Sequence, residues 1–199
     1  MMLQRTRAEQ VQPVYELFVK RYPSVQVAAK ENPDRIRYLL NSLGLKWRTE
    51  KILEVIGVLA KDGLVPRNRN ELIKLPGVGS YVANAFLSLF ANTRAPITDR
   101  NAVRIWGRIF GFEAGSETHR KKWFIDLAEE MTPEMNFRLF NYAVLDLSRT
   151  ICKVKPDCNN CPLRPHCSYF CALKSVRAVS NERGGVPVHS FCGFELDSG

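Results

Sequence analysis

The chain has 199 residues, of which 45% are hydrophobic, enough to bury a core in one domain or in two small lobes. No uninterrupted apolar run approaches about 18 residues, so we expect no membrane-spanning helix; no apolar stretch follows the charged N-terminus, so we expect no secretory signal. A soluble, intracellular protein is the expectation, with its six cysteines in a reducing compartment. The 29 Lys and Arg exceed the 20 Asp and Glu by 9, which fits a nucleic-acid partner as well as plain solubility.

Apolar residues recur with the 3.6-residue period of helices along most of the chain, and period-2 alternation is scarce. Asn32 and Pro33 form an N-cap and first-turn pair that predicts a helix through Leu40. The apolar stripes, which we interpret as core, are Val11, Val14, Tyr15, Phe18 and Val19; Ile52, Val55, Ile56 and Leu59; Trp123, Phe124, Leu127, Ala128 and Met131; and Phe140, Ala143, Val144 and Leu147. The pattern predicts an all-α fold.

The segment Leu75-Pro76-Gly77-Val78-Gly79-Ser80 separates a short predicted helix, 71–74, from a longer one, 81–90. Its two glycines allow an approach to the backbone that a Cβ would block. Exposed N–H groups at the start of the second helix, together with the helix dipole, favour an anion there. The hairpin therefore predicts a site for a DNA phosphate without sequence readout. A tight helix–helix turn is the alternative.

Asp99 lies eighteen residues after Tyr81, at the start of another predicted helix. Its residue type and position predict an N-cap. A cap carboxylate that accepts backbone N–H bonds also has the character needed to face a developing cation. Capping and catalysis are both open on this evidence.

Four cysteines are spaced with gaps of five, two and five residues: Cys152, Cys158, Cys161 and Cys167. Thiolates this close on a Pro-punctuated, loop-rich segment can converge on one metal centre. Four cysteines ligate either a [4Fe–4S] cluster or a structural zinc ion. The single Cys-x-x-Cys pair favours the cluster, and zinc remains the alternative.

Together, the Leu-Pro-Gly-Val-Gly hairpin, the following Asp and the four-cysteine loop resemble the helix-hairpin-helix, Gly/Pro-rich, Asp-bearing (HhH-GPD) DNA glycosylases, the superfamily of endonuclease III and the A/G-specific adenine glycosylases. The resemblance covers about residues 2–170. It implies two helical lobes, 1–111 with the hairpin and the Asp and 112–171 with a [4Fe–4S] loop. After Cys171 the pattern fades into a polar, Gly-rich stretch, which predicts a disordered tail, 172–199. The resemblance also implies a monomer that binds double-stranded DNA, flips a mismatched or damaged base and cuts its N-glycosidic bond.

The resemblance assigns roles to individual residues. Asp99 matches the catalytic Asp, which stabilises the oxocarbenium-like sugar, and Asn101 matches an Asn that orients water or backbone. Gln4 and Leu45 match positions that wedge side chains into the gap left by the flipped base, although Leu45 is equally compatible with the core. The expected DNA-binding set is Gln4, Arg5, Leu45, Gly77, Val78, Gly79 and Ser80. The cysteines match the cluster ligands, with five residues in the first gap where the family usually has six.

Tyr81 indicates the branch of the superfamily. Bifunctional lyases carry Lys at the matching position, and its amine forms a Schiff base with the sugar. Tyr cannot do so, which implies a monofunctional glycosylase that leaves an intact abasic site. Tyr here resembles the thymine-DNA mismatch glycosylases, whereas adenine glycosylases commonly have Ser. The leading hypothesis is removal of thymine or uracil opposite guanine, and the alternative is removal of adenine from A·G or A·8-oxoguanine pairs.

One departure concerns the N-terminus. Both mismatch branches carry a Glu immediately before the segment that matches Met2-Leu3-Gln4-Arg5-Thr6, preceded by a helix. The resemblance implies that this chain lacks both that Glu and the helix. A third hypothesis is therefore a catalytically weak, DNA-binding iron–sulfur protein.

Overall fold

The computed structural model describes residues 1–173, and every regular element in that range is helical, which confirms the predicted all-α class. No helix within those residues is long and apolar enough to cross a membrane. The chain divides into two compact units, Met1–Thr93 and Arg94–Gly199. Of the predicted tail, 172–199, only residues 172 and 173 are described, and both are helical.

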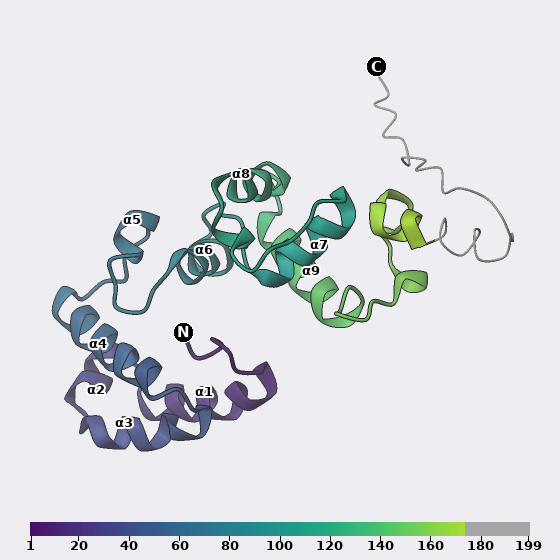
Figure 1. Cartoon of the computed structure of the whole chain (residues 1–199). Coiled ribbons are helices and arrows are strands. Elements are labelled where there is room, and N and C mark those ends of the chain that lie inside the picture. Colours follow the sequence, from purple (N-terminus) through teal and green to yellow (C-terminus); the bar gives the residue numbers. More distant parts are fainter. Residues whose placement is uncertain (174–199) are drawn as a thin grey trace, which may run out of the picture. The chain divides into compact units, whose positions relative to one another are not determined.

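The first unit is a small helical bundle that ends in a helical hairpin (Figure 1). Its elements are α1 (Ala8–Arg21), α2 (Val25–Lys30), α3 (Pro33–Leu40), a 3-10 turn η1 (Asn41–Leu43), α4 (Lys46–Asp62), α5 (Arg69–Leu72) and α6 (Ser80–Leu89). Helix α4 contacts both α2 and α3, and α1 contacts α3. Asn32 caps α3, with Pro33 in its first turn, as the sequence predicts.

The core of this unit is formed by Val11, Tyr22, Ala28, Ile36, Leu40, Leu43, Ile52 and Ile56. The prediction that the whole α1 stripe is core is wrong in part, because Tyr15 is 53% and Val19 43% exposed. Periodicity identifies the apolar face of a helix, but the width of the contact with α3 decides how much of that face is covered.

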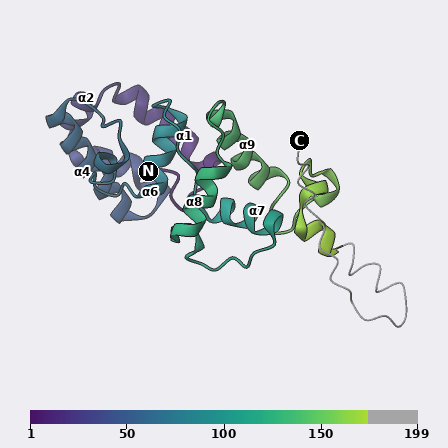
Figure 2. The same ribbon diagram turned by 90° about the horizontal axis from the view of Figure 1, so that it is seen from above.

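The second unit contains α7 (Arg100–Phe110), η2 (Thr118–Arg120), α8 (Lys122–Met131), α9 (Phe137–Thr150), η3 (Cys158–Asn160) and η4 (Arg164–His166) (Figure 2). Helix α7 packs against α9, with the rings of Trp106 and Phe140 stacked at 6.2 Å. The predicted first lobe extended through Gly111, whereas this packing places α7 with the second unit. Phe124 is fully buried, but Trp123, also predicted as core, is 45% exposed.

Candidate functional site

The hairpin between α5 and α6 uses its two glycines differently. Gly77 has φ +71°, and a Cβ there would lie 2.8 Å from Cβ of Lys51 on α4. Gly79 has φ −91°, and a Cβ there would meet nothing within 4 Å. The fold itself therefore requires the first glycine but not the second.

The start of α6 is open on the side of Gly79. Gly79 is the N-cap, and no side chain caps the helix. The side chain of Val78 is buried and anchors the turn, while the hydroxyl of Ser80 accepts a hydrogen bond of 3.0 Å from Nη2 of Arg69. Tyr81 follows on α6 and is 38% exposed. An uncapped N-terminus beside a residue without a side chain is a place where an anion can approach backbone N–H groups.

Asp99 is the N-cap of α7 and is half-buried. Its Oδ1 accepts a bond of 2.7 Å from the backbone N–H of Ala102, and its Oδ2 accepts one of 2.8 Å from Nδ2 of Asn101. The predicted cap is confirmed. Asn101, predicted to orient water or backbone, contacts the carboxylate directly. Of the three residues predicted for catalysis, Asp99, Asn101 and Tyr81, the first two therefore lie together.

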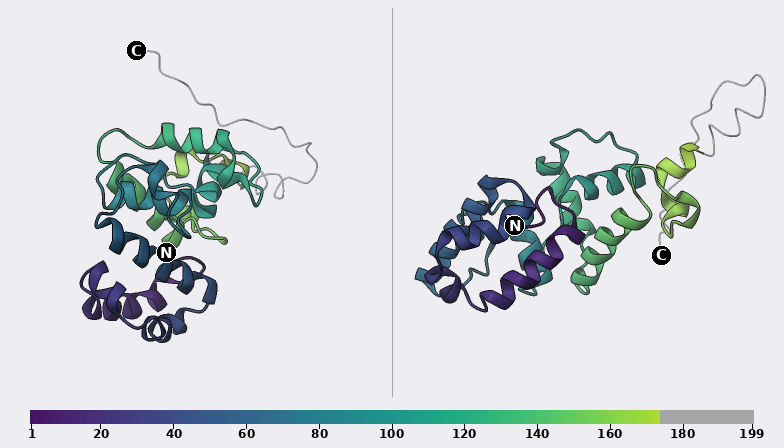
Figure 3. Two further views of the ribbon diagram at one scale, coloured as in Figure 1. Left: turned by 90° about the vertical axis from the view of Figure 1, so that its left-hand side faces the viewer. Right: turned by 90° about the horizontal axis from the view of Figure 1, so that it is seen from below.

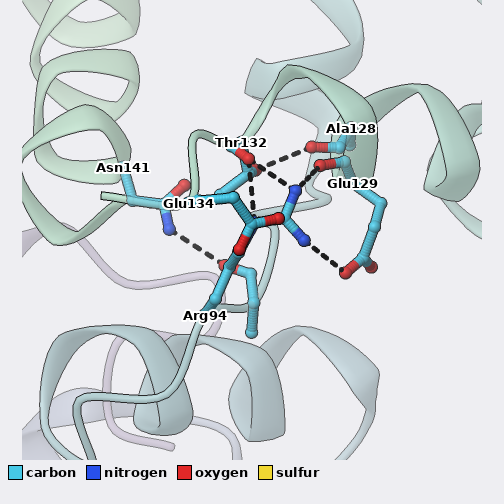
Figure 4. Close-up of polar contacts among 7 residues, drawn as sticks. Arg94, Ala128, Glu129, Thr132, Glu134 and Asn141 are labelled. Atoms are coloured by element: carbon cyan, nitrogen blue, oxygen red, sulfur yellow. Dashed lines mark hydrogen bonds and ion pairs between the residues drawn. The ribbon is translucent and has the colours of Figure 1, made fainter. Parts of the chain in front are cut away.

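The segment that leads to Asp99 is held by polar contacts from Arg94 and Asn141 (Figure 4). Nε of Arg94 donates to the carbonyl of Thr132 at 3.0 Å, and its Nη2 donates to the carbonyl of Glu129 at 2.6 Å. Nδ2 of Asn141 donates to the carbonyl of Ala95 at 2.9 Å. These bonds satisfy carbonyls at the end of α8 and fix the chain immediately before the carboxylate.

The predicted wedge residues lie on two loops of the first unit. Gln4 is half-buried, and its Nε2 donates to the carbonyl of Gly77 at 3.4 Å; its neighbour Arg5 is exposed, with φ +55°. Leu45 is half-buried and left-handed, with φ +56°. Leu43, two residues earlier, belongs to the buried cluster around Ile36 and Ile52, and the wedge role of Leu45 stays a prediction.

The four cysteines line one cavity. They lie in the loop after α9, whose backbone is drawn from green to yellow in Figure 3. Arg108, Arg164, Tyr169 and Phe170 also line the cavity. Burial, and then the nearby Cys167 and Cys161, raise the pKa of the Cys158 thiol. No group of three or more His, Cys, Asp or Glu in residues 1–173 has the geometry of an ion site. The shared cavity, and not a ready-made coordination geometry, is what supports a site here.

Comparison with known proteins places this arrangement in a family. Residues 60–89 match the helix-hairpin-helix motif. The thymine-DNA glycosylase of Aeropyrum pernix is 34% identical over 178 residues, covering 85% of this chain and 79% of that protein. The chain belongs to the HhH-GPD superfamily of DNA glycosylases. The thymine/uracil-DNA glycosylase of Methanothermobacter thermautotrophicus is also 34% identical, covering 85% of this chain and 78% of that protein.

Other members of the superfamily are also similar. The adenine DNA glycosylase of Buchnera aphidicola subsp. Baizongia pistaciae is 32% identical and covers 94% of this chain, but the match spans 54% of that protein. Among solved structures, a thermostable thymine-DNA glycosylase superposes with a TM-score of 0.78 at 34% identity, covering 86% of this chain and 81% of that one. A trapped endonuclease III–DNA covalent intermediate superposes with a TM-score of 0.76 at 22% identity, which shows the shared fold.

Three arginines of the glycosylase hold distant segments of the chain in place, and the sequence did not reveal this role. Arg48 is 1% exposed, Arg94 holds the segment before Asp99, and Arg108 donates to Sγ of Cys152 at 3.3 Å. Each binds groups that are more than thirty residues away in the sequence. In a single sequence they cannot be told apart from surface arginines, which are the usual kind.

Proposed function

We propose that this glycosylase removes thymine or uracil mispaired with guanine and leaves the abasic strand uncut. The observation that carries the proposal is the fixed carboxylate of Asp99. One of its oxygens accepts a hydrogen bond from the N–H of Ala102 and the other accepts one from the amide of Asn101. A carboxylate fixed before the reaction stabilises positive charge without reorganising, and this is the largest contribution available to N-glycosidic cleavage.

The chemistry is a hydrolysis. Once the base is flipped out of the stack, its bond to C1′ lengthens and the sugar gains oxocarbenium character, which Asp99 stabilises. Water adds to C1′ and gives up a proton, for which Asp99 is the candidate base. The hydroxyl remains on the sugar, and the departing base gains a proton.

Tyr81 supports the monofunctional assignment. A Schiff-base lyase needs an amine to attack the sugar, and a phenol has none. The substrate assignment draws on the two relatives at 34% identity, which are named for thymine and uracil. Adenine removal is the second candidate, because an adenine DNA glycosylase is 32% identical over 94% of this chain.

The hairpin supports DNA binding through a phosphate. Nothing in the described protein requires Gly79 to lack a Cβ, since its φ is −91° and the space around it is open. The presence of glycine at this position is explained if an external group approaches the uncapped N-terminus of α6. The net charge of +9 favours the same partner.

The four-cysteine cavity supports a [4Fe–4S] cluster held by Cys152, Cys158, Cys161 and Cys167. Four thiols that line one cavity offer the donor set of a polynuclear cluster. Arg108, whose guanidinium also lies 4.9 Å from the ring of Tyr169, supplies a positive charge beside the thiolates. When bound, the cluster would cross-link the loop after α9; no step of the hydrolysis passes through it.

The test is strand cleavage of labelled duplexes that carry G·T, G·U, A·G or A·8-oxoguanine, with and without hot alkali. We expect alkali-dependent cleavage at G·T and G·U that disappears in Asp99→Asn. Cleavage at the adenine pairs alone would establish the second candidate. Cleavage without alkali, accompanied by a borohydride-trapped complex, would overturn the monofunctional assignment.

A further inference from the structure

Arg48, near the start of α4, is a buried cation that belongs neither to the Asp99 site nor to the hairpin nor to the cysteine loop. It is 1% exposed and heads the fully buried side chains of the described residues by volume. Burial lowers the pKa of its guanidinium. Its hydrogen-bond acceptors are the carbonyls of Met2, Gln4, Leu43 and Gly44 and the hydroxyl of Thr6. All five are neutral oxygens, so this is not a salt bridge but a clamp on backbone.

The clamp joins two loops. Nη1 donates to the carbonyl of Met2 at 2.7 Å and to Oγ1 of Thr6 at 3.0 Å, on either side of Gln4. Nη2 donates to the carbonyl of Leu43 at 2.8 Å, two residues before Leu45. One planar group thus holds both segments that carry the predicted wedge side chains.

Both loops hold a non-glycine residue in the left-handed region. Among residues 1–173, only Arg5, Leu45, Asn92 and Asn136 combine a side chain with positive φ. Asn tolerates this conformation, whereas Arg and Leu do so at an energetic cost. Strained residues persist where the surroundings over-determine them, and they cluster at functional sites. Here the strain lies next to Gln4 and at Leu45, the two wedge positions.

The side chain of Gln4 is also incompletely satisfied. Its Nε2 reaches the carbonyl of Gly77 at 3.4 Å, while its Oε1 is buried with no hydrogen-bond partner within residues 1–173. A buried amide with an unused acceptor is costly for a purely structural residue. It suits a side chain that gains a partner when DNA is bound.

We propose that Arg48 is a positioning residue that fixes Gln4 and Leu45 relative to each other, so that the two side chains enter the duplex as one preformed unit. The inference rests on the proposed function. Ordering the loops before binding removes the entropy cost of ordering them on the DNA. Packing alone would not need a guanidinium, since a buried charge is often replaced by an apolar side chain without loss of stability.

A double-mutant cycle tests this inference. The variants are Arg48→Lys, Leu45→Ala and the pair combined. The control is Arg37→Lys on α3, because Arg37 forms exposed ion pairs with Asp34 and Glu50. The measurements are single-turnover excision at saturating enzyme and the fluorescence of 2-aminopurine beside the mismatch. A lysine ammonium cannot span both loops as the guanidinium fork does.

We expect Arg48→Lys to lower the excision rate and the fluorescence change about tenfold, with affinity for an undamaged duplex changed less than about twofold. The combined variant should be no slower than Leu45→Ala alone, because both changes remove the same wedge. If the two effects multiply, or if Arg48→Lys matches Arg37→Lys, the inference is wrong. Thr6→Val removes one acceptor of Arg48 and the hydroxyl's own contacts of 3.4 Å with the carbonyls of Gln4 and Leu43. It should change the rate in the same direction if Arg48→Lys fails to fold.

The outcomes also separate the two proposals. A wild-type protein that excises no base from any of the duplexes overturns the proposed function, and the inference falls with it. A wild-type protein that excises thymine or uracil, together with multiplicative effects in the cycle, overturns the inference alone.

Discussion

The amide of Asn101 donates a hydrogen bond of 2.8 Å to Oδ2 of Asp99, while the other carboxylate oxygen caps α7. One residue therefore serves both as a helix cap and as the candidate catalyst. The two roles have different chemical requirements, since a cap needs an acceptor oxygen and the reaction needs negative charge. Substitutions can separate them.

Asp99→Asn keeps an acceptor at the cap and removes the charge. We expect its free energy of unfolding to stay within about 0.5 kcal/mol of wild type, whereas Asp99→Ala should lose about 1 kcal/mol. Both variants should lose excision by about a hundredfold or more. Denaturant unfolding and single-turnover kinetics measure the two effects. An Asp99→Asn variant that retains its rate would remove Asp99 from the mechanism.

Asn101→Asp tests the pairing through pH. It places a second carboxyl 2.8 Å from Oδ2 of Asp99, where two negative charges repel each other. One carboxyl of the pair then has a raised pKa and stays protonated to higher pH. Excision should therefore fall at low pH and recover as the pH rises through that pKa, so the pH–rate profile shifts to higher pH. A profile that coincides with wild type would mean that the pair is not part of the reacting site.

Substitution by alanine should have different effects at the two hairpin glycines. Gly77→Ala forces a Cβ to within 2.8 Å of Cβ of Lys51 at φ +71°, so it should destabilise the protein by about 1–3 kcal/mol. Among the described residues a Cβ at Gly79 meets nothing within 4 Å, so Gly79→Ala should cost at most about 1 kcal/mol, the usual loss for alanine at an N-cap, while it weakens DNA binding. Thermal unfolding and duplex affinity over a range of salt concentrations separate the effects. Unchanged affinity in Gly79→Ala would leave the hairpin as a structural turn.

Local signals in the sequence predicted the parts of the site that depend on neighbours in the chain. The hairpin, the cap at Asp99 and the four-cysteine spacing each lie within a short segment, where residue type dictates geometry. The arginine clamps were out of reach, because Arg48 binds Met2 across 46 residues. Burial was also only partly predictable, since the pattern that places Phe124 in the core places Trp123 there too, although it is 45% exposed.

Leu45→Gly separates strain from function. Glycine adopts the left-handed conformation without cost, so the variant should be unchanged or up to about 1–2 kcal/mol more stable. It should excise more slowly if the side chain of Leu45 is the predicted wedge. Leu43→Ala is the contrast, since Leu43 is 7% exposed in the core and its loss should cost about 2–5 kcal/mol. If the Leu45→Gly protein is as unstable as the Leu43→Ala protein, Leu45 is a core residue and not a wedge.

The contacts of Arg108 lead to a prediction about how firmly the cysteine loop holds the proposed cluster. Its Nη1 donates to Sγ of Cys152 at 3.3 Å and to the carbonyl of Lys153 at 2.6 Å, so it fixes the first of the proposed ligands and places positive charge beside it. Protein purified anaerobically should carry about four iron atoms per chain. Arg108→Met should release iron to a chelator several times faster, because the loop is loosened and the thiolate charge is less compensated. Arg120→Met, which removes only an exposed ion pair with Glu117, should match wild type. Stoichiometric zinc in place of iron would overturn the cluster assignment, and equal release rates in the two variants would assign Arg108 no part in holding it.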